Sequence, residues 1–254
     1  MDPLVVAVFL IVYAGMILGE IPGLALDRSG IALLGAIAIL ASGRLTLAEA
    51  WAAVDVSTIA LLFGLMVVSA QFRLGGFYAE TVRRIASRAA APDALLLWVI
   101  VAAGLLSAVL ANDIVCLAMA PMLVEVCARR HIAPLPFLLA LACAANVGSA
   151  ATLIGNPQNM FIGQSLQLSF AQYLADGGPP AALGLAITWA VIRWQWRGRW
   201  SSERHAEEQP HRDSATPGAG HVQSPPFDRW QTAKGLLLLA LVVGAFLFTT
   251  CRAT

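Results

Sequence analysis

Residues 145–163, ANVGSAATLIGNPQNMFIG, carry the clearest structural signal in the sequence. Pro157 lacks a backbone N–H and disfavours helix at Asn156, and the glycines permit torsions that leave the helical region. We therefore predict a broken helix over residues 137–168, where the apolar pattern is otherwise continuous. A proline-kinked span packed by small residues is the plainer alternative.

The same stretch is rich in hydrogen-bonding side chains. Irregular backbone at membrane depth is tolerated only where it lines a cavity, and an unwound helix frees carbonyls for a cation and amides for an anion. The segment is thus a candidate site for a substrate or ion, and Gly148 and Gly155 would permit the break. Its polar members are Asn146, Ser149, Thr152, Asn156, Gln158 and Asn159.

The composition around this stretch excludes a soluble enzyme. Of 254 residues, 59% are hydrophobic and only 12% are charged, with a mean hydropathy of +0.74, whereas soluble chains carry roughly a quarter charged residues. We expect an all-α polytopic membrane protein. Its transporter repeat covers residues 1–196, with spans at 3–19, 29–43, 56–72 and 180–195, a polar cytoplasmic linker at 197–234, and the first span of a missing second repeat at 235–254.

A second polar place interrupts the apolar pattern of residues 94–128. Ala111, Asn112 and Asp113 separate two arms that are short for a full crossing, which favours a re-entrant hairpin, although two tilted spans would fit the charges equally well. An unpaired carboxylate or amide in hydrocarbon costs at least about 2 kcal/mol. Asn112 and Asp113 are therefore candidate binding residues, unless they form an ordinary turn in headgroup water.

The distribution of basic residues predicts the orientation in the membrane, and the positions of the cysteines and histidines argue against a metal site. Every lysine and arginine except Arg44 and Arg252 falls on one side of this topology, which predicts an N-terminus outside the cell membrane. Residues 76–91 have the pattern of an amphipathic helix on the membrane surface. The four cysteines lack ligand-like spacing, and the four histidines lie in polar loops, so we expect no metal site, no cofactor and no nucleic-acid partner.

Two motifs carry a resemblance to a known group of carriers. ANDIVCLAMAPML (111–123) and residues 145–163 resemble the ion transporter superfamily, which includes arsenite permeases, NhaD-type sodium/proton antiporters, citrate transporters and divalent-anion/sodium symporters. Weaker similarity extends over residues 20–163. Here the tip is Ala-Asn-Asp, where the symporter branch has Ser-Asn-Thr, so sodium-coupled dicarboxylate transport fits the tip less well than arsenite-permease-like transport.

The resemblance implies two inverted repeats, each with a re-entrant hairpin and a broken helix whose tips meet near the membrane midplane. It places Asn112 and Asp113 at the hairpin tip and sets five residues opposite as the unwound segment: Ser149, Thr152, Gly155, Asn156 and Pro157. Asp113 would accept a proton or cation, and Asn112 and Asn156 would coordinate the substrate or ion.

These expectations define a function and two alternatives. The expected function is secondary active transport of an anion or oxyacid by alternating access, coupled to H⁺ or Na⁺. An NhaD-like Na⁺/H⁺ antiporter is one alternative; a truncated or split half that serves only as an assembly partner is the other. The expected partners are the bilayer of the inner (plasma) membrane, a small anion or ion, a second repeat or companion chain, and a second copy in a homodimer.

Overall fold

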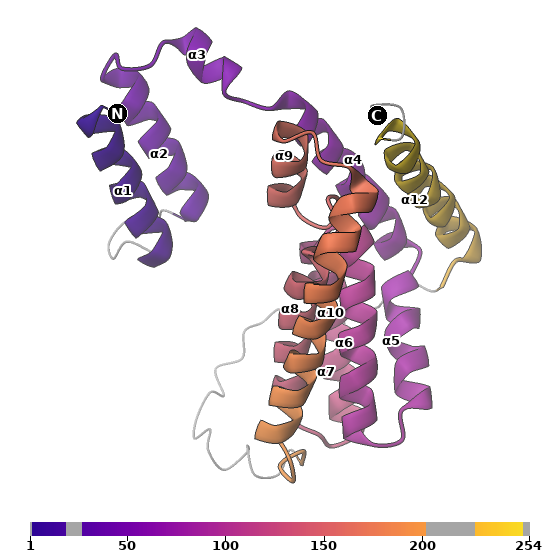
Figure 1. Ribbon diagram of the computed structural model, residues 1–254. Helices are drawn as coiled ribbons and strands as arrows, with labels where there is room; N and C mark the ends of the chain where they lie inside the picture. Colours follow the sequence, from indigo (N-terminus) through magenta and orange to yellow (C-terminus); the bar gives the residue numbers. More distant parts are fainter. Residues whose placement is uncertain (1, 19–26, 202–226, 251–254) are drawn as a thin grey trace. The chain divides into compact units, whose positions relative to one another are not determined.

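The computed structural model describes residues 2–18, 27–201 and 227–250, and every regular element within these ranges is a helix (Figure 1). The predicted all-α class is therefore confirmed. The chain divides into two compact units, Met1–Val56 and Ser57–Thr254. The helices are α1 (Pro3–Leu18), α2 (Arg28–Ala41), α3 (Leu47–Ala52), α4 (Val56–Leu74), α5 (Phe77–Arg88), α6 (Pro92–Val109), α7 (Asn112–Arg129), α8 (Leu135–Ser149), α9 (Pro157–Ser165), α10 (Phe170–Gln195) and α12 (Arg229–Thr250).

The first unit pairs α1 with α2. Gly15 is buried against Ile31, and Asp27 starts α2 by accepting a hydrogen bond from Gly30 N at 2.8 Å. The short helix α3 was not predicted, yet it begins with a capping box in which Thr46 and Glu49 satisfy each other's backbone amides. A Thr-x-x-Glu pattern is a sequence signal for such a helix start, so α3 was predictable.

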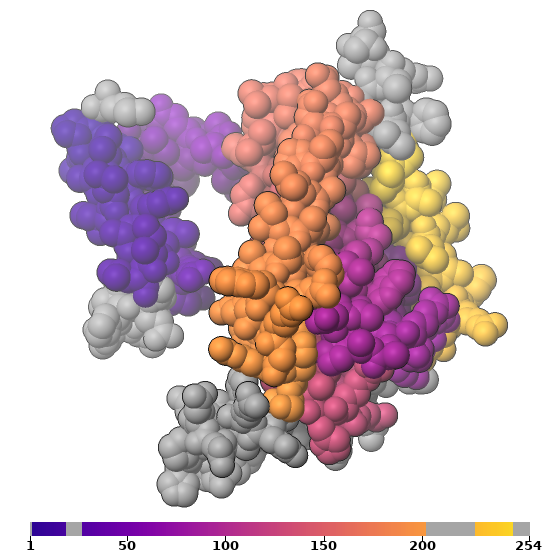
Figure 2. Space-filling model, turned by 60° about the horizontal axis from the view of Figure 1, so that its bottom comes forward, coloured from indigo at the N-terminus to yellow at the C-terminus, as the bar shows by residue number. Residues whose placement is uncertain are grey.

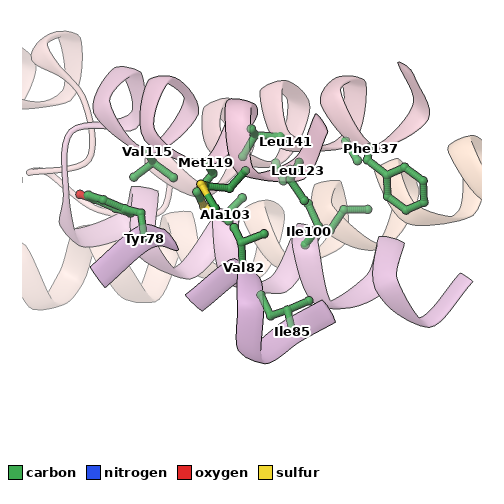
Figure 3. Close-up of a cluster of buried hydrophobic side chains, with 14 of the residues drawn as sticks. Tyr78, Val82, Ile85, Ile100, Ala103, Val115, Met119, Leu123, Phe137 and Leu141 are labelled. Carbon is green, nitrogen blue, oxygen red and sulfur yellow. The ribbon is translucent and has the colours of Figure 1, made fainter. Parts of the chain in front are cut away.

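The core of the second unit lies where α5, α6, α7 and α8 meet (Figure 3). Side chains from all four helices interdigitate there, as close packing requires. The labelled members are Tyr78, Val82 and Ile85 of α5, Ile100 and Ala103 of α6, Val115, Met119 and Leu123 of α7, and Phe137 and Leu141 of α8.

The packing of α5 corrects one prediction. Its sequence is amphipathic, and Arg83, Arg84 and Arg88 are exposed as expected. Its apolar face, however, is buried against α6 and α7 and is not left free for the membrane surface. The hydrophobic pattern of a helix reports that one face is covered, but it does not report whether protein or lipid covers it.

The boundaries of α10 correct a second prediction. Residues 169–179 were expected to be an outside loop before a span at 180–195, but α10 runs without interruption from Phe170 to Gln195. Pro179 and Pro180 therefore lie inside a helix. The residue before a proline is normally pushed out of the helical region, in part by its own Cβ. The residue before Pro179 is Gly178, which has no Cβ.

The region after α10 corrects a third prediction, the bounds of the polar linker. The linker was expected at 197–234, but residues 196–201 fold back beneath the α7–α8 turn, where Ala133 N donates to Trp200 O at 3.0 Å. At the other end, α12 begins at Arg229 and not at residue 235, because the Asp228 carboxylate accepts hydrogen bonds from Trp230 N and Gln231 N. The central part of the predicted linker, 202–226, lies outside the described residues, as do residues 251–254.

Hydrophobic surface remains in both units. Among the described helices, α4 and α6 are long and apolar enough to cross a membrane, while α1, α2 and α8 are apolar but shorter. Many large side chains are exposed, such as Ile11 at 70% and Phe63 at 69%. Soluble monomers rarely expose so much apolar surface.

Candidate functional site

One pocket of the second unit is lined by both polar segments of the sequence, although they lie far apart along the chain. The tip between α6 and α7 forms one side, and the segment between α8 and α9 forms another. A third wall comes from α4. The lining residues are Leu62, Leu65 and Met66 of α4, Ala111 to Ile114 of the tip, Ile154 to Pro157 of the break, and Met160 of α9.

The start of the tip is held by hydrogen bonds from two successive backbone amides. Leu110 N donates to Leu106 O at 2.8 Å, which closes α6, and Ala111 N donates to the hydroxyl of Ser69 on α4 at 3.4 Å. Ala111 is the N-cap of α7 and offers no side-chain acceptor. The first amides of α7 therefore border the pocket without a capping side chain, where the partial positive charge of a helix N-terminus favours negative ligands.

In the break between α8 and α9, the side-chain carboxamides of Asn156 and Asn159 form hydrogen bonds with backbone groups that the helices leave unpaired. Asn156 caps α9, since its Oδ1 accepts from Asn159 N at 2.8 Å. The Asn159 side chain is buried and donates to Ser149 O at 3.2 Å and to Thr152 O at 2.9 Å. These two carbonyls are freed where the helix ends, and a buried carbonyl without a partner would cost about 1–3 kcal/mol. Asn159 therefore stabilises the non-helical path.

Three contacts fasten the tip to the break. The Thr152 hydroxyl donates to Ala108 O in the last turn of α6, and Asn112 Nδ2 donates to Asn146 Oδ1 at 3.4 Å. The third contact is a close approach of the α6 and α8 backbones. A Cβ built on Gly148 would lie 2.7 Å from the carbonyl carbon of Gly104 and closer still to its oxygen. The two polar segments are thus parts of one packed assembly.

The ten predicted site residues fall into two groups of five. Those that line the pocket are Asn112, Asp113, Gly155, Asn156 and Pro157. Those that contact the rest of the protein without lining it are Asn146, Gly148, Ser149, Thr152 and Asn159. The second group builds and braces the break.

Sequence reasoning missed the wall that α4 contributes. Leu62, Leu65 and Met66 belong to a uniformly apolar run, so their side chains carry no signal that one face borders a pocket. Ser69 was detectable from the sequence, because it places a hydroxyl within this apolar run. In the structure it is fully buried and accepts a hydrogen bond from Ala111 N. A lone serine in an apolar helix normally needs such a partner.

The charge of the pocket comes from one group. Among the described residues that line it, Asp113 is the ionisable one, and its side chain is exposed. No lysine or arginine lines it there, and no group of three metal-binding side chains occurs in the described parts of the chain. The pocket therefore offers helix-end amides, two carboxamides and one carboxylate against an otherwise apolar wall.

Comparison with known proteins identifies the class of this chain. Residues 7–253 match the family model of the citrate transporters. The silicon efflux transporter LSI3 of Oryza sativa subsp. japonica is 34% identical over 173 residues, which are 68% of this chain and 36% of that protein. The inner membrane protein YbiR of Escherichia coli (strain K12) is 33% identical over 147 residues, 58% of this chain and 39% of that protein.

A third relative is also a membrane protein of which the chain covers only part. The 46 kDa membrane protein of Mycobacterium leprae (strain TN) is 29% identical over 195 residues, which are 76% of this chain and 44% of that protein. The chain thus spans less than half the length of these curated relatives. The family is one of transporters and not of enzymes, and LSI3 is named as a transporter. YbiR and the 46 kDa protein are named as membrane proteins.

Proposed function

The chain belongs to the citrate transporter family, and we propose that it forms the substrate-binding part of a secondary transporter that moves an anion or oxyacid by alternating access. One observation carries the proposal. The tip 111–114 and the break 154–157, distant in sequence, line one pocket together. Both segments begin a helix, α7 and α9, so both bring the positive end of a helix dipole to that pocket.

The chemistry of the pocket favours a solute rich in oxygen and low in net charge. The amide groups of Asn112 and Asn156 can hydrogen-bond hydroxyl or oxyanion oxygens. No lysine or arginine among the described lining residues would offset a dianion, and the Asp113 carboxylate would repel one. A weakly acidic oxyacid fits these groups, in keeping with a relative named for silicon efflux.

Asp113 is the residue that we propose couples transport to an ion gradient. It lies in the first turn of α7, at the pocket and exposed, where it can take up a proton or pair with Na⁺. The same carboxylate supports a second candidate function, Na⁺/H⁺ exchange. Flux of protons that depends on Na⁺ and needs no anion would select that alternative.

The proposed movement involves the tip and the break together. Because Thr152, Asn112 and Gly148 join the two segments, they would shift as one body relative to a scaffold. We propose that a second, inverted repeat or companion chain completes the carrier, that the complete form is a homodimer in the inner membrane, and that the N-terminus lies outside. If the chain serves only as an assembly partner, transport will depend entirely on that second part.

The test is transport by the Asp113→Asn variant in proteoliposomes. Uptake of silicic acid, arsenite and citrate is measured with an imposed H⁺ or Na⁺ gradient, with Asp176→Asn as the matched control, because Asp176 is an exposed carboxylate of α10 that does not line this pocket. We expect Asp113→Asn to abolish the response to the gradient and Asp176→Asn to keep it. Equal gradient-driven uptake by both variants would refute the role of Asp113.

A further inference from the structure

The C-terminal end of α10 carries an unusual run of residues that the transport site does not use. WAVIRWQWRGRW, residues 189–200, contains four tryptophans and three arginines. Tryptophan is enriched where membrane meets water, because its ring is apolar and its N–H is polar. Arginine binds phosphate through two parallel hydrogen bonds. The run therefore combines the two residue types that suit a lipid headgroup region.

The protein holds this run in one place. The rings of Trp200 and Phe137 lie 5.7 Å apart, and Ile132 pairs with Ser201 in an isolated antiparallel bridge. Gly198 adopts a positive φ of 76°, which turns the chain back towards the α7–α8 turn. Residues 196–201 are therefore anchored on the protein surface by both side-chain and backbone contacts.

Two arginines at this end of the second unit form contacts within the protein. Arg193 lies 3.4 Å from the Asp93 carboxylate at the start of α6, and its guanidinium stacks 4.9 Å from the Trp189 ring centre. Arg130 donates to the carbonyls of Ala86 and Ala89, which end α5. These contacts bring the ends of α5, α7 and α10 and the start of α6 to the same end of the second unit.

Other arginines at this end remain available. Arg197 and Arg199 are exposed and form no ion pair with any residue in the described ranges, and the same holds for Arg88. Next to them Trp194 is 79% exposed. Figure 2 brings this end of the second unit forward and shows the C-terminal part of α10 (orange) on the surface beside the magenta segments of α5 and α6.

Among the described residues, the charge at this end is strongly positive. The two carboxylates that the structure describes there, Asp93 and Glu125, are each already paired with an arginine. The arginines are Arg88, Arg129, Arg130, Arg193, Arg197 and Arg199. A surplus of positive charge at the end of an apolar bundle attracts the anionic lipids of the facing leaflet.

We infer that Arg197 and Arg199, with Trp194 beside them, form a binding surface for the phosphate headgroups of anionic phospholipids. Trp194 would set the depth of the run at the membrane interface, and the two guanidiniums would bind the phosphodiester. The exposed indole is the reason to favour a lipid over a soluble phosphate, because a soluble anion gains nothing from an apolar ring beside it.

The test compares lipid binding to the purified protein in detergent by native mass spectrometry. The probes are dioleoylphosphatidylglycerol and dioleoylphosphatidylcholine, and the variant is Arg197→Gln with Arg199→Gln. Each arginine near a lipid surface contributes roughly fivefold in affinity, so we expect phosphatidylglycerol to bind roughly 30-fold more weakly to the double variant. Phosphatidylcholine binding should not change.

The matched control removes the same charge elsewhere. Arg28→Gln with Arg73→Gln alters two exposed arginines that, like Arg197 and Arg199, form no ion pair within the described ranges, and it should leave phosphatidylglycerol binding unchanged. Three outcomes would overturn the proposal: equal binding of the two lipids to the native protein, an equal loss in the control, or full displacement of phosphatidylglycerol by millimolar inorganic phosphate. Because every substituted side chain is exposed, a matching elution volume on size exclusion verifies that the variants remain folded.

Discussion

Replacing Gly148 by alanine tests the packing that joins the tip to the break. A Cβ at this position would lie 2.7 Å from the carbonyl carbon of Gly104 and nearer to the oxygen and Cα, all of them backbone atoms of α6 that no rotamer change can move. The helices α6 and α8 must therefore separate. Overpacking of this kind costs about 1–3 kcal/mol, against a gain of about 1 kcal/mol in helix propensity for alanine over glycine.

Subtracting the propensity gain leaves an expected net loss of about 0–2 kcal/mol in the free energy of unfolding. For a chain of this size that lowers the thermal midpoint by up to about 8 °C. The separation would also lengthen the bond from Thr152 to Ala108 O, one turn nearer the tip, so transport should fall together with stability. Thermal unfolding in detergent and uptake in proteoliposomes measure the two effects.

The matched control is Gly64→Ala in α4. A Cβ there meets no atom within 4 Å, so alanine should be neutral or slightly stabilising. If Gly148→Ala unfolds at the same temperature as Gly64→Ala, the close approach of α6 and α8 is wrong, and the tip is not braced against the break in the way described here.

Three further substitutions test separate parts of the structure. Asn159→Leu leaves Thr152 O without its donor and leaves Ser149 O with only the longer bond from Asn156 Nδ2 at 3.5 Å. It should cost about 1–3 kcal/mol in chemical unfolding, whereas Gln158→Leu, which is exposed, should cost little; equal losses would contradict the bracing role. Thr152→Val removes the hydroxyl bond to α6 and should cost about 1 kcal/mol, with no change expected if that bond is absent. Hydrogen bonds from the Thr46 backbone and side chain hold the pKa of Glu49 below its ordinary value, so the α3 capping box should persist above the ordinary pKa and be lost as pH falls through the lowered one. Hydrogen exchange of the α3 amides measures this, and Thr46→Ala should remove the pH dependence.

The sequence predicted the polar segments well because their signal is local. Gly155, Asn156 and Pro157 disfavour a continuous helix, and the structure leaves the helix at residues 150–156. The same type of signal misled at Gly177-Gly178-Pro179-Pro180, which reads as a loop yet lies inside α10. Torsional preferences are weak enough that packing in the folded chain can overrule them.

Which site residues line the pocket and which brace the break was not predictable from the sequence. Asn156 and Asn159 look equivalent as carboxamides three residues apart, but one borders the pocket and the other is buried against two carbonyls. Which side a carboxamide faces depends on the path of the break. The wall from Leu62 and Met66 was hidden for a different reason, since an apolar residue has the same signal whether it faces lipid, core or pocket.

The arrangement of a whole carrier stays a prediction. The second repeat, the orientation in the membrane and the coupling ion rest on the resemblance, the charge pattern and the Asp113 carboxylate. The lipid surface at Arg197 and Arg199 is independent of them, because it needs only the end of α10 and the leaflet that faces it.

We propose that the tip and the break bind the transported solute together. Solute protection of single cysteines, Ala111→Cys and Pro157→Cys, tests this in a protein whose four native cysteines are replaced by alanine. Both positions line the pocket, and neither side chain is assigned a hydrogen bond to the solute. The control is Gln172→Cys on α10, an exposed position outside this pocket. Silicic acid and citrate are tested separately against labelling by a maleimide. We expect a solute that the protein transports to slow labelling at 111 and 157 together and to leave 172 unchanged. A transported solute that protects only one of the two positions, or neither, would contradict it.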